Sequence, residues 1–409
     1  MKNKVLTGLL LVLIGGWGNL LAQNAGSNYA RQVNTLIGTK GVGLTSGYLY
    51  PGATYPYGMV QFTPSYFSKR SGFVINQLSG GGCEHMGNFP TFPVKGKLKM
   101  SPDNILNYRI NISEEKGHAG YYEAMVQEDI KAKLTVTERT GMASYEYPAD
   151  QQYGTVIIGG GISATPIEQA AIVITAPNKC EGYAEGGNFC GLRTPYKVYF
   201  VAEFDADALE SGTWKRDELK PNTTFAEGEY SGVYFTFDVS KKKNVQYKIG
   251  VSYVSVENAR ENLKAENTGW DFLQIQNQAE SKWNHYLGKI EVEGTNPDRA
   301  TQFYTHLYRS FIHPNVCSDV NGEYMGADFR VHKSRSKHYT SFSNWDTYRT
   351  QIQLLSMLDP EVASDIVISH QLFAEEAGGA FPRWVMANIE TGVMQGDPTP
   401  ILISNAYAF

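Results

Sequence analysis

Three short segments of the chain have residue types that could bind a ligand. The first, residues 78–88, contains three consecutive glycines, Gly80 to Gly82, followed by Cys83. Consecutive glycines let backbone groups approach a ligand closely, whereas a phosphate loop is excluded because no Gly-Lys-Ser/Thr follows. A binding loop and a tight turn between two strands explain this segment equally well.

The second segment, residues 343–350, places an aromatic and an acidic side chain at the start of a predicted helix. Trp345 and Asp346 are adjacent there, and the positive N-terminal end of a helix dipole stabilises a carboxylate. The alternative is structural, with Asp346 capping the helix and Trp345 in the core. Residue types alone slightly favour this alternative.

The third segment places Arg383 beside Trp384, and Asp397 follows within residues 396–398. A planar guanidinium next to an aromatic face suits a sugar, although the same residues could be loop scaffolding. Missing motifs exclude a HExxH metal site, a GxSxG serine hydrolase and a GxGxxG dinucleotide-binding unit. His306 and His313 lie in a segment rich in Tyr and Phe, and we expect core or rim histidines there rather than metal ligands.

Composition limits the class of protein. The 409 residues are 42% hydrophobic and 19% charged, which argues against disorder and fibrous repeats. The net charge is -5 and no basic stripe occurs, so a nucleic-acid partner is not expected. The 26 Tyr and 41 Gly suit a protein rich in strands and loops, and flat aromatic faces are compatible with carbohydrate binding.

Residues 1–22 resemble a signal peptide. Lys2 and Lys4 precede an apolar run over residues 5–14, which is shorter than the roughly 20 residues that a membrane-spanning helix needs. Cleavage is expected after Ala22, and no Cys lies nearby that could carry a lipid anchor. We therefore expect an exported soluble protein, periplasmic or secreted and not held in a membrane. The alternative is a buried N-terminal helix.

Export permits disulfides, and the chain has four cysteines. Cys180 and Cys190 close a short Gly-rich loop and are the disulfide candidate, with two free thiols as the alternative. Cys83 and Cys317 are expected to be unpaired. No CxxC pair occurs, which argues against a structural zinc site.

The N-terminal two thirds of the chain has the periodicity of strands. In residues 130–137, Ile130, Ala132, Leu134 and Val136 alternate with Lys and Thr, which predicts a half-buried antiparallel strand. Turn-forming residues separate further runs of this kind and no helix intervenes, so the sequence predicts an antiparallel β-sandwich. These runs are residues 145–147, 155–158, 198–204, 233–237 and 245–256.

The periodicity then changes to that of helices. Apolar residues three and four apart predict an amphipathic helix over residues 270–286. Three more helices are expected, one with Phe303, Leu307 and Phe311 on one face, one with Trp345, Tyr348, Ile352 and Leu355, and one over residues 361–376. The predicted domains are a signal peptide (1–22), a β-sandwich (23–265), a helical connector (266–297) and a helical domain (298–409).

The helical domain is too small for its apolar faces, and the chain ends shortly after the apolar run 401–403. We expect that the domain is cut off and that the face with Phe303, Leu307 and Phe311 is exposed and promotes association. The alternative is a small helical appendage docked on the sandwich.

Several runs of residues resemble glycoside hydrolase family 92. The resemblance begins at residues 33–39 and 50–61 and is most specific at Trp345-Asp346-Thr347-Tyr348-Arg349. It implies an exported, calcium-dependent exo-α-mannosidase whose N-terminal β-sandwich is joined by helices to an (α/α)6 barrel, of which this chain holds the beginning. The other matching runs are residues 78–83, 189–191, 308–310, 313–315, 382–384 and 396–398.

The resemblance also implies residue roles. Trp345 and Asp346 would lie in the pocket for the terminal mannose, with Trp345 packed on the ring and Asp346 accepting hydrogen bonds from sugar hydroxyls. The remaining implied sugar-binding residues are Gly82, Cys83, Arg383, Trp384 and Asp397.

In the family a Glu acts as general acid and an Asp as general base with inversion, and calcium binds the mannose 2- and 3-hydroxyls. These motifs lie beyond the position that matches Phe409, so we expect no catalytic residue and no calcium ligand set in this chain, and no turnover by the 409 residues alone. The implied substrate is mannose-containing glycan, N-glycan or mannan, with an α-1,2 preference left open because Asn405 stands where an Asp is usual. The alternatives are a non-catalytic glycan-binding protein and a purely structural sandwich.

Overall fold

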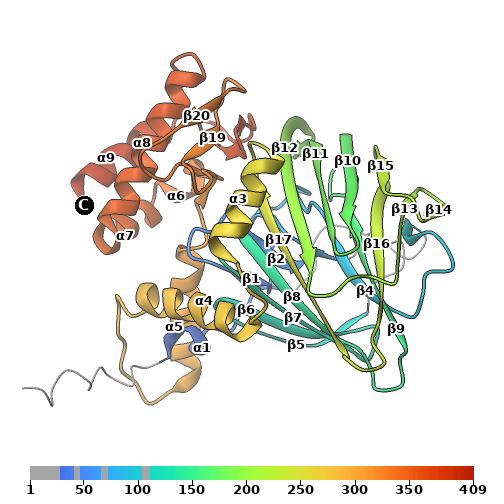
Figure 1. Ribbon diagram of the computed structural model, residues 1–409. Coiled ribbons are helices and arrows are strands. Elements are labelled where there is room, and N and C mark those ends of the chain that lie inside the picture. The colour runs from blue at the N-terminus through green and yellow to red at the C-terminus, as the bar shows by residue number, and fades with distance from the viewer. Residues whose placement is uncertain (1–27, 41–46, 66–71, 104–110) are drawn as a thin grey trace, which may run out of the picture.

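The computed structural model describes residues 28–40, 47–65, 72–103 and 111–409, and Figure 1 shows a β-sandwich followed by helices. This arrangement confirms the predicted fold class. The predicted signal peptide, residues 1–22, lies outside the described residues. Within the described ranges, no helix is long and apolar enough to cross a membrane.

One layer of the sandwich is an eight-stranded sheet in the order β1-β2-β3-β4-β9-β16-β13-β14. All of its paired neighbours are antiparallel. Its strands are β1 (Ala53–Thr54), β2 (Gln61–Pro64), β3 (Phe73–Val74), β4 (Thr91–Lys95), β9 (Tyr153–Gly159), β13 (Glu210–Lys215), β14 (Glu218–Pro221) and β16 (Ser231–Asp238).

The other layer is a nine-stranded antiparallel sheet in the order β15-β10-β11-β12-β17-β8-β7-β6-β5. Its strands are β5 (Ile112–His118), β6 (Tyr121–Val126), β7 (Ile130–Val136), β8 (Thr140–Glu146), β10 (Ile167–Ala176), β11 (Lys179–Phe189), β12 (Leu192–Phe204), β15 (Phe225–Glu227) and β17 (Asn244–Ser252).

Side chains alternate between the two faces of the nine-stranded sheet. On β12, Phe200 and Phe204 point into the sandwich core, and the ring of Phe204 contacts that of Phe235 on the opposite sheet with centroids 4.8 Å apart. Val201, between them, packs on the outer face against Ala259 of a helix. The outer face of this sheet is therefore covered by a helix at this position. Strand β7 of the same sheet shows the alternation of buried and half-buried residues that its sequence predicts.

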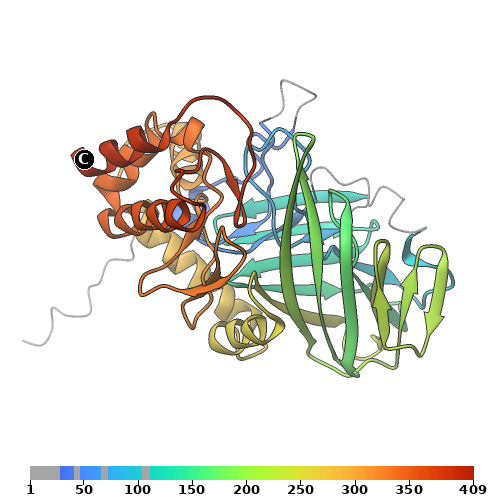
Figure 2. The same ribbon diagram turned by 90° about the horizontal axis from the view of Figure 1, so that it is seen from above.

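The helices gather on one side of the sandwich, as Figure 2 shows. The helices are α1 (Tyr29–Gln32), α3 (Val256–Glu266), α4 (Phe272–Leu287), α5 (Pro297–Ser310), α6 (Asn344–Thr347), α7 (Gln351–Leu358), α8 (Pro360–Glu376) and α9 (Thr399–Ala408). The part of the chain that contains α5 to α9 also has three two-stranded sheets, of which β19–β20 and β22–β23 are hairpins and β18–β21 pairs more distant segments. The strands of these small sheets are β18 (Asn315–Val316), β19 (Glu323–Met325), β20 (Val331–Lys333), β21 (Tyr339–Thr340), β22 (Val385–Met386) and β23 (Ile389–Glu390).

Side-chain caps fix the starts of the helices that follow the sandwich. The side chain of Ser255 accepts a hydrogen bond from the Asn258 backbone at the start of α3. Asp271 does the same for α4, and Asn296 for α5, where Pro297 occupies the first turn. Each cap satisfies backbone N–H groups that have no partner inside the helix.

The helix predicted around Trp345 is broken in the structure. It consists of the single turn α6 and the separate helix α7, because the Tyr348 carbonyl is bound by two side chains, Gln353 Nε2 at 3.0 Å and Asn405 Nδ2 at 2.9 Å. Gln351 Nε2 in turn donates to the carbonyls of Ser310 and His313, at 2.8 and 3.0 Å.

The expectation of an exposed face on α5 is wrong. Leu307 is 5% and Phe311 0% exposed, and Phe303 is half-buried. The covering residues come from the N-terminal segment, whose Tyr50 and Tyr57 share a second hydrophobic core with α4 and α5.

Hydrogen bonds fix the N-terminal segment against these helices. The Trp283 indole of α4 donates to the Thr54 carbonyl at 2.7 Å. The hydroxyls of Thr54 and Tyr308 also lie 2.7 Å apart. Since Thr54 belongs to the sandwich, the N-terminal segment joins both parts of the chain.

A buried carboxylate joins α3 to the segment that leads into the β19–β20 hairpin. Asp319 accepts hydrogen bonds from Ser252 Oγ at 2.7 Å, Asn258 Nδ2 at 2.9 Å and Asn262 Nδ2 at 2.6 Å. Burial raises the pKa of the Asp319 carboxyl, although these three hydrogen bonds oppose the shift. The last strand of the sandwich, α3 and the hairpin are thus held together at one point.

Candidate functional site

An isolated antiparallel bridge between Ser343 and Trp384 brings the second and third predicted segments together. The Asn344 backbone N–H donates to the Arg383 carbonyl at 3.1 Å, and that of Val385 donates to the Phe342 carbonyl at 2.9 Å. The two segments therefore lie side by side although about forty residues separate them. Trp345, Asp346, Arg383 and Trp384 are consequently close neighbours.

The carboxylate of Asp346 interacts with the side chain of Trp384. Desolvation by the surrounding protein raises the pKa of the Asp346 carboxyl, and the Trp384 hydrogen bond and the Arg349 charge oppose that rise. The residue is nevertheless exposed to solvent. A carboxylate that is fixed on one side and open on the other can accept further hydrogen bonds from a neutral ligand.

The capping role proposed as an alternative for Asp346 does not agree with the structure. The N-cap of α6 is Ser343, and no side-chain hydrogen bond caps this single turn. Asp346 lies inside the turn, where its carboxylate interacts with the side chain of Trp384. The carboxylate therefore contributes to the contact between the two segments.

The Trp345 ring is half-buried and lies against a cation. The Arg349 guanidinium is 4.7 Å from the Trp345 ring centroid and 4.8 Å from that of Tyr348. Arg349 Nη1 also donates to the Trp345 carbonyl at 2.8 Å. These contacts fix the orientation of the indole.

Trp384 is buried and links the helical part of the chain to the sandwich. Its ring stacks on that of Phe189, with 4.6 Å between centroids and 29° between planes. Phe189 is the last residue of β11, directly before Cys190. The sandwich therefore supports the indole that binds Asp346.

The predicted disulfide between Cys180 and Cys190 is wrong, because Cys190 is bonded to Cys83. Cys180 and Cys190 lie at opposite ends of the extended strand β11, roughly 30 Å apart at the rise of a strand, whereas a disulfide needs Cα atoms within about 7 Å. Cys180 and Cys317 are buried free thiols. The bond fixes the Gly-rich loop beside Phe189.

Two neutral histidines hold this Gly-rich loop. His85 Nε2 accepts from the Leu78 backbone N–H at 2.8 Å, and His313 Nε2 accepts from that of Ser79 at 2.9 Å. Burial lowers the pKa of each imidazole to about 4, so both are uncharged acceptors near neutral pH. A Cβ on Gly81 would lie 2.9 Å from the His85 ring, which explains the glycine at that position. His313 is thus a core histidine.

The backbone and one side-chain nitrogen of Arg383 are used by the β22–β23 hairpin. Glu390 Oε2 accepts from the backbone N–H groups of Arg383 at 2.7 Å and Trp384 at 3.1 Å. Arg383 Nε donates to the Val393 carbonyl at 2.9 Å. These contacts agree with the interpretation of this segment as loop scaffolding. They also fix the position of Trp384 next to Asp346.

Some of the predicted site residues lie apart from the contact between Asp346 and Trp384. Gly82 is exposed on the loop that Cys83 anchors, next to the ring of Tyr48. Asp397 is exposed in the segment between β23 and α9, and within the described part of the chain no hydrogen bond or ion pair joins it to Asp346. Phe189 and Glu390 were not identified from residue types, although the position of Phe189 beside a cysteine was a usable signal.

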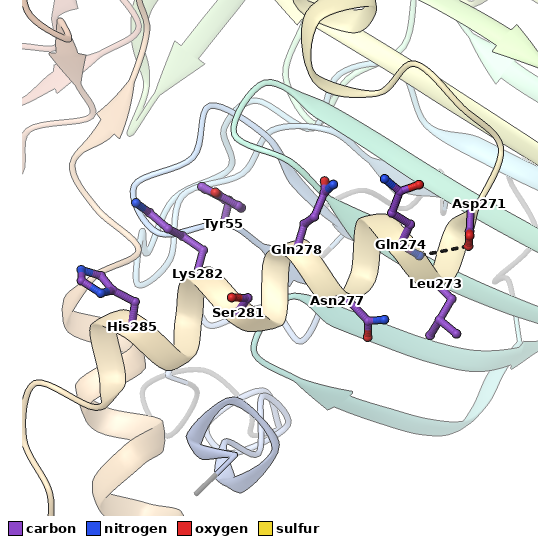
Figure 3. A pocket seen from close by; sticks show the side chains of 9 residues that line it. All are labelled: Tyr55, Asp271, Leu273, Gln274, Asn277, Gln278, Ser281, Lys282 and His285. Carbon is purple, nitrogen blue, oxygen red and sulfur yellow. Dashed lines mark hydrogen bonds between the residues drawn. The ribbon is translucent and has the colours of Figure 1, made fainter. Parts of the chain in front are cut away.

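Cavities elsewhere on the molecule are lined by other residues. The one in Figure 3, about 760 Å³, lies along the exposed face of α4, with Tyr55 and Lys282 near one end and Asp271 at the other. In Figure 3 the Asp271 carboxylate is bonded to the Gln274 backbone, at 3.0 Å. A second cavity, about 710 Å³, lies between the β19–β20 hairpin and α8. Neither includes Asp346 or Trp384.

The described residues offer one group of side chains with the spacing of metal ligands: Asp328, His332 and Glu376. This group does not fit calcium, because calcium takes six to eight oxygen ligands and one of these three is an imidazole. No catalytic step in this chain is therefore derived through calcium.

Comparison with known proteins identifies the family. The profile of the Glycosyl hydrolase family 92 N-terminal domain matches residues 32–252, and that of the Glycosyl hydrolase family 92 catalytic domain matches residues 258–409. The chain is also similar to an uncharacterized secreted glycosidase of Arthroderma benhamiae, with 26% identity over 363 residues, 78% of this chain and 45% of the relative.

Two solved structures from Bacteroides thetaiotaomicron have the same fold. A family GH92 α-mannosidase, also solved with mannoimidazole, has a TM-score of 0.84 and 25% identity and matches 94% of this chain and 56% of its own. A family GH92 inverting mannosidase has a TM-score of 0.80 and 24% identity and matches 93% of this chain and 52% of its own.

The chain spans about half the length of these relatives. Both family profiles match it in order, and together they account for residues 32–252 and 258–409. The chain therefore belongs to glycosyl hydrolase family 92.

Proposed function

We propose that this chain is part of an α-mannosidase that releases terminal mannose from glycans, and that Asp346 and Trp384 form part of its sugar-binding surface. The observation that carries the proposal is the bridge between Ser343 and Trp384, which brings the Trp384 side chain to the Asp346 carboxylate, with Phe189 stacked on Trp384. Family membership and the likeness to an α-mannosidase solved with mannoimidazole support it.

The chemistry of these side chains suits a neutral sugar. A hydrogen bond to a charged acceptor contributes about 1.5–3 kcal/mol, and the exposed side of the Asp346 carboxylate is free to accept such bonds from hydroxyl groups. Trp345 offers a half-buried aromatic face next to this carboxylate. The proposed set also includes Gly82 and Cys83 of the Gly-rich loop, Arg383 and Asp397.

We further propose exo action with inversion and a preference for α-1,2-linked mannose in N-glycans or mannans. The general acid, the general base and the calcium ligands would come from the part of the relatives that this chain does not span. An inverting pair needs about 6.5–9.5 Å between carboxyl groups so that a water molecule fits between them. Export, to the periplasm or medium through a signal peptide at residues 1–22, completes the proposal.

The experiment uses a chain extended to the length of the relatives, assayed with calcium on α-1,2-, α-1,3- and α-1,6-linked mannobiose. Proton NMR of the first product distinguishes the outcomes, because inversion of an α-linkage releases β-mannose. We expect release from at least one linkage and the fastest release from α-1,2. Release of glucose or galactose from matched disaccharides without release of mannose would contradict the proposal.

A further inference from the structure

A second candidate site lies between the β19–β20 hairpin and the end of α8. Each of Asp328, His332 and Glu376 presents one ligand atom, and these atoms lie within 4.8 Å of one another. Asp328 belongs to the turn of the hairpin, His332 to β20, and Glu376 is the last residue of α8. All three are half-buried, at the wall of the 710 Å³ cavity.

A glycine makes room for the approach of the three side chains. A Cβ on Gly326 would lie 2.6 Å from the His332 ring, 2.8 Å from Asp328 Oδ1 and 2.8 Å from Glu376 Oε2. Each of these distances is shorter than ordinary van der Waals contact. The backbone at this position thus forms a cradle that stays open only because no side chain fills it.

Neighbouring groups fix the candidate ligands. The Tyr324 hydroxyl donates to Glu376 Oε1 at 2.6 Å, and the Ala327 backbone N–H donates to Glu376 Oε2 at 2.9 Å. The Tyr324 ring also stacks on that of His332, at 5.7 Å and 28°. His332 Nε2 lies 2.9 Å from Asp328 Oδ1. Such outer contacts orient ligands in metal sites.

We propose that Asp328, His332 and Glu376 bind a divalent transition-metal ion of the zinc type, with water completing its coordination. An imidazole and two carboxylates suit zinc, which takes nitrogen and oxygen ligands in four-coordinate geometry. The site is distinct from the calcium requirement proposed for the family, because calcium is bound through oxygen. The negative C-terminal end of the α8 dipole also favours a cation beside Glu376.

Cations already present nearby do not block the site. Arg330 Nε lies 4.0 Å from Asp328 Oδ2, but the Arg330 side chain is 82% exposed and can turn into solvent. Lys333 and Arg335 line the same cavity, where Glu375 adds a negative charge. Binding of the metal would replace the hydrogen bond between His332 and Asp328.

A bound ion would connect the β19–β20 hairpin to α8. The segment of this hairpin also contacts the part of the chain that holds the proposed sugar site. The Gly326 carbonyl accepts a hydrogen bond from Asn388 Nδ2 at 3.0 Å. Asn388 belongs to the turn between β22 and β23, the hairpin that follows Trp384. The metal would therefore stiffen the support of Trp384 without contacting the sugar.

The test is a zinc titration of the 409-residue chain after dialysis against a chelator, with a fluorescent zinc indicator as competitor. We expect one tightly bound ion per chain, an increase in Tm with zinc concentration, and no displacement by a large excess of calcium. Cobalt as a probe should give the visible absorption of a low-symmetry site. Absence of binding at millimolar zinc, or displacement by calcium, overturns the proposal.

Variants locate the ion. His332→Gln and Glu376→Gln should each weaken zinc binding by at least about tenfold, and Tyr324→Phe, which keeps the stacked ring, by about 10–100-fold. Glu375→Gln is the matched control, since Glu375 lines the same cavity but is bonded to Gln371. His306→Gln, which removes an exposed histidine on α5, is a second control. Unchanged affinity in the first two variants, with circular dichroism showing the folded state, overturns the proposal.

Discussion

The indole ring of Trp384 stacks on the phenyl ring of Phe189 with 4.6 Å between their centroids. These residues belong to the two regions that the family profiles describe separately, the sandwich and the catalytic domain. Because the Trp384 side chain also interacts with Asp346, we expect a substitution at the end of β11 to alter the proposed sugar site through this aromatic contact.

Asp346→Ala, in a chain of the length of the relatives, should lower kcat/KM for mannoside by about ten- to a few-thousand-fold. The loss corresponds to one or two hydrogen bonds to a charged acceptor, each about 1.5–3 kcal/mol, at ~1.4 kcal/mol per tenfold change in rate. Steady-state kinetics together with Tm measures it. Asp298→Asn, an acidic residue in the first turn of α5, is the control. A variant that melts early but turns over normally would reduce Asp346 to a structural residue.

Trp384→Phe should shift the acid limb of the pH profile of kcat/KM upward. The hydrogen bond from Trp384 lowers the pKa of the Asp346 carboxyl, so its removal adds to the rise that desolvation already causes. The carboxylate is then protonated at a higher pH and stops accepting hydrogen bonds there. The phenyl ring keeps the contact with Phe189, and Phe189→Leu serves as the comparison, since it alters the stack but keeps the hydrogen bond. An unshifted acid limb in Trp384→Phe would contradict the role given to this bond.

The disulfide assignment predicts a definite thiol count. The denatured, unreduced protein should show two reactive thiols, Cys180 and Cys317, and peptide mapping should recover Cys83 linked to Cys190. Replacing both bonded cysteines by Ser should lower the free energy of unfolding by roughly 4–5 kcal/mol, since the bond closes a loop with a sequence separation of 107. Recovery of a peptide linking Cys180 to Cys190 would contradict the assignment.

The free energy of unfolding should depend on pH in part through Glu280. Burial disfavours its charge, but hydrogen bonds from His118, Arg31 and Gln276 outweigh this and lower the pKa of the carboxyl to about 2. A folded-state pKa below the ordinary value of 4.5 stabilises the fold at pH above that value, and this contribution is lost as pH falls from 4.5 towards 2.

We expect Glu280→Gln to lower the free energy of unfolding at pH 7 by on the order of 2 kcal/mol, with solvent screening allowed for. The difference from the wild type should shrink as the pH falls, because the wild type then loses the same charge. Urea unfolding at several pH values measures this difference, with Glu375→Gln on the surface of α8 as control. A difference that does not depend on pH would rule out the linkage.

The 409-residue chain itself should release no mannose from α-linked mannobiose in the presence of calcium. The reason is the resemblance, which places the acid, the base and the calcium motifs beyond the position that matches Phe409. Coupled detection of free mannose over long incubation is sufficient. The extended chain is the positive control. Release of mannose that depends on the 409-residue chain would contradict the prediction.

Local patterns were sufficient for the elements that bury one apolar face. The alternation from Ile130 to Val136 predicted β7, and the spacing of Ile275, Ala279 and Trp283 predicted α4. The sequence did not predict α3, because two of its four buried side chains are Asn258 and Asn262, which bind Asp319 instead of a hydrophobic core. A buried polar face has no apolar periodicity to detect.

Contacts between distant segments could not be predicted in the same way. The partner of Cys190 depends on where the loop with Cys83 lies against the end of β11, and the short separation from Cys180 gave the wrong pair. The break after α6 depends on Asn405, whose amide reaches the Tyr348 carbonyl from α9. The motifs around Trp345 and Trp384 were identified from sequence, whereas the bridge between Ser343 and Trp384 that brings them together required the fold.

The residues that cover α4 and α5 are synthesised before the helices themselves. Tyr50 and Tyr57 leave the ribosome, and cross a membrane if the chain is exported, well ahead of Trp283 and Phe311. Until those helices follow, the aromatic surface of this early segment has no partner in the chain, and a sandwich folded from the first half alone leaves it in water.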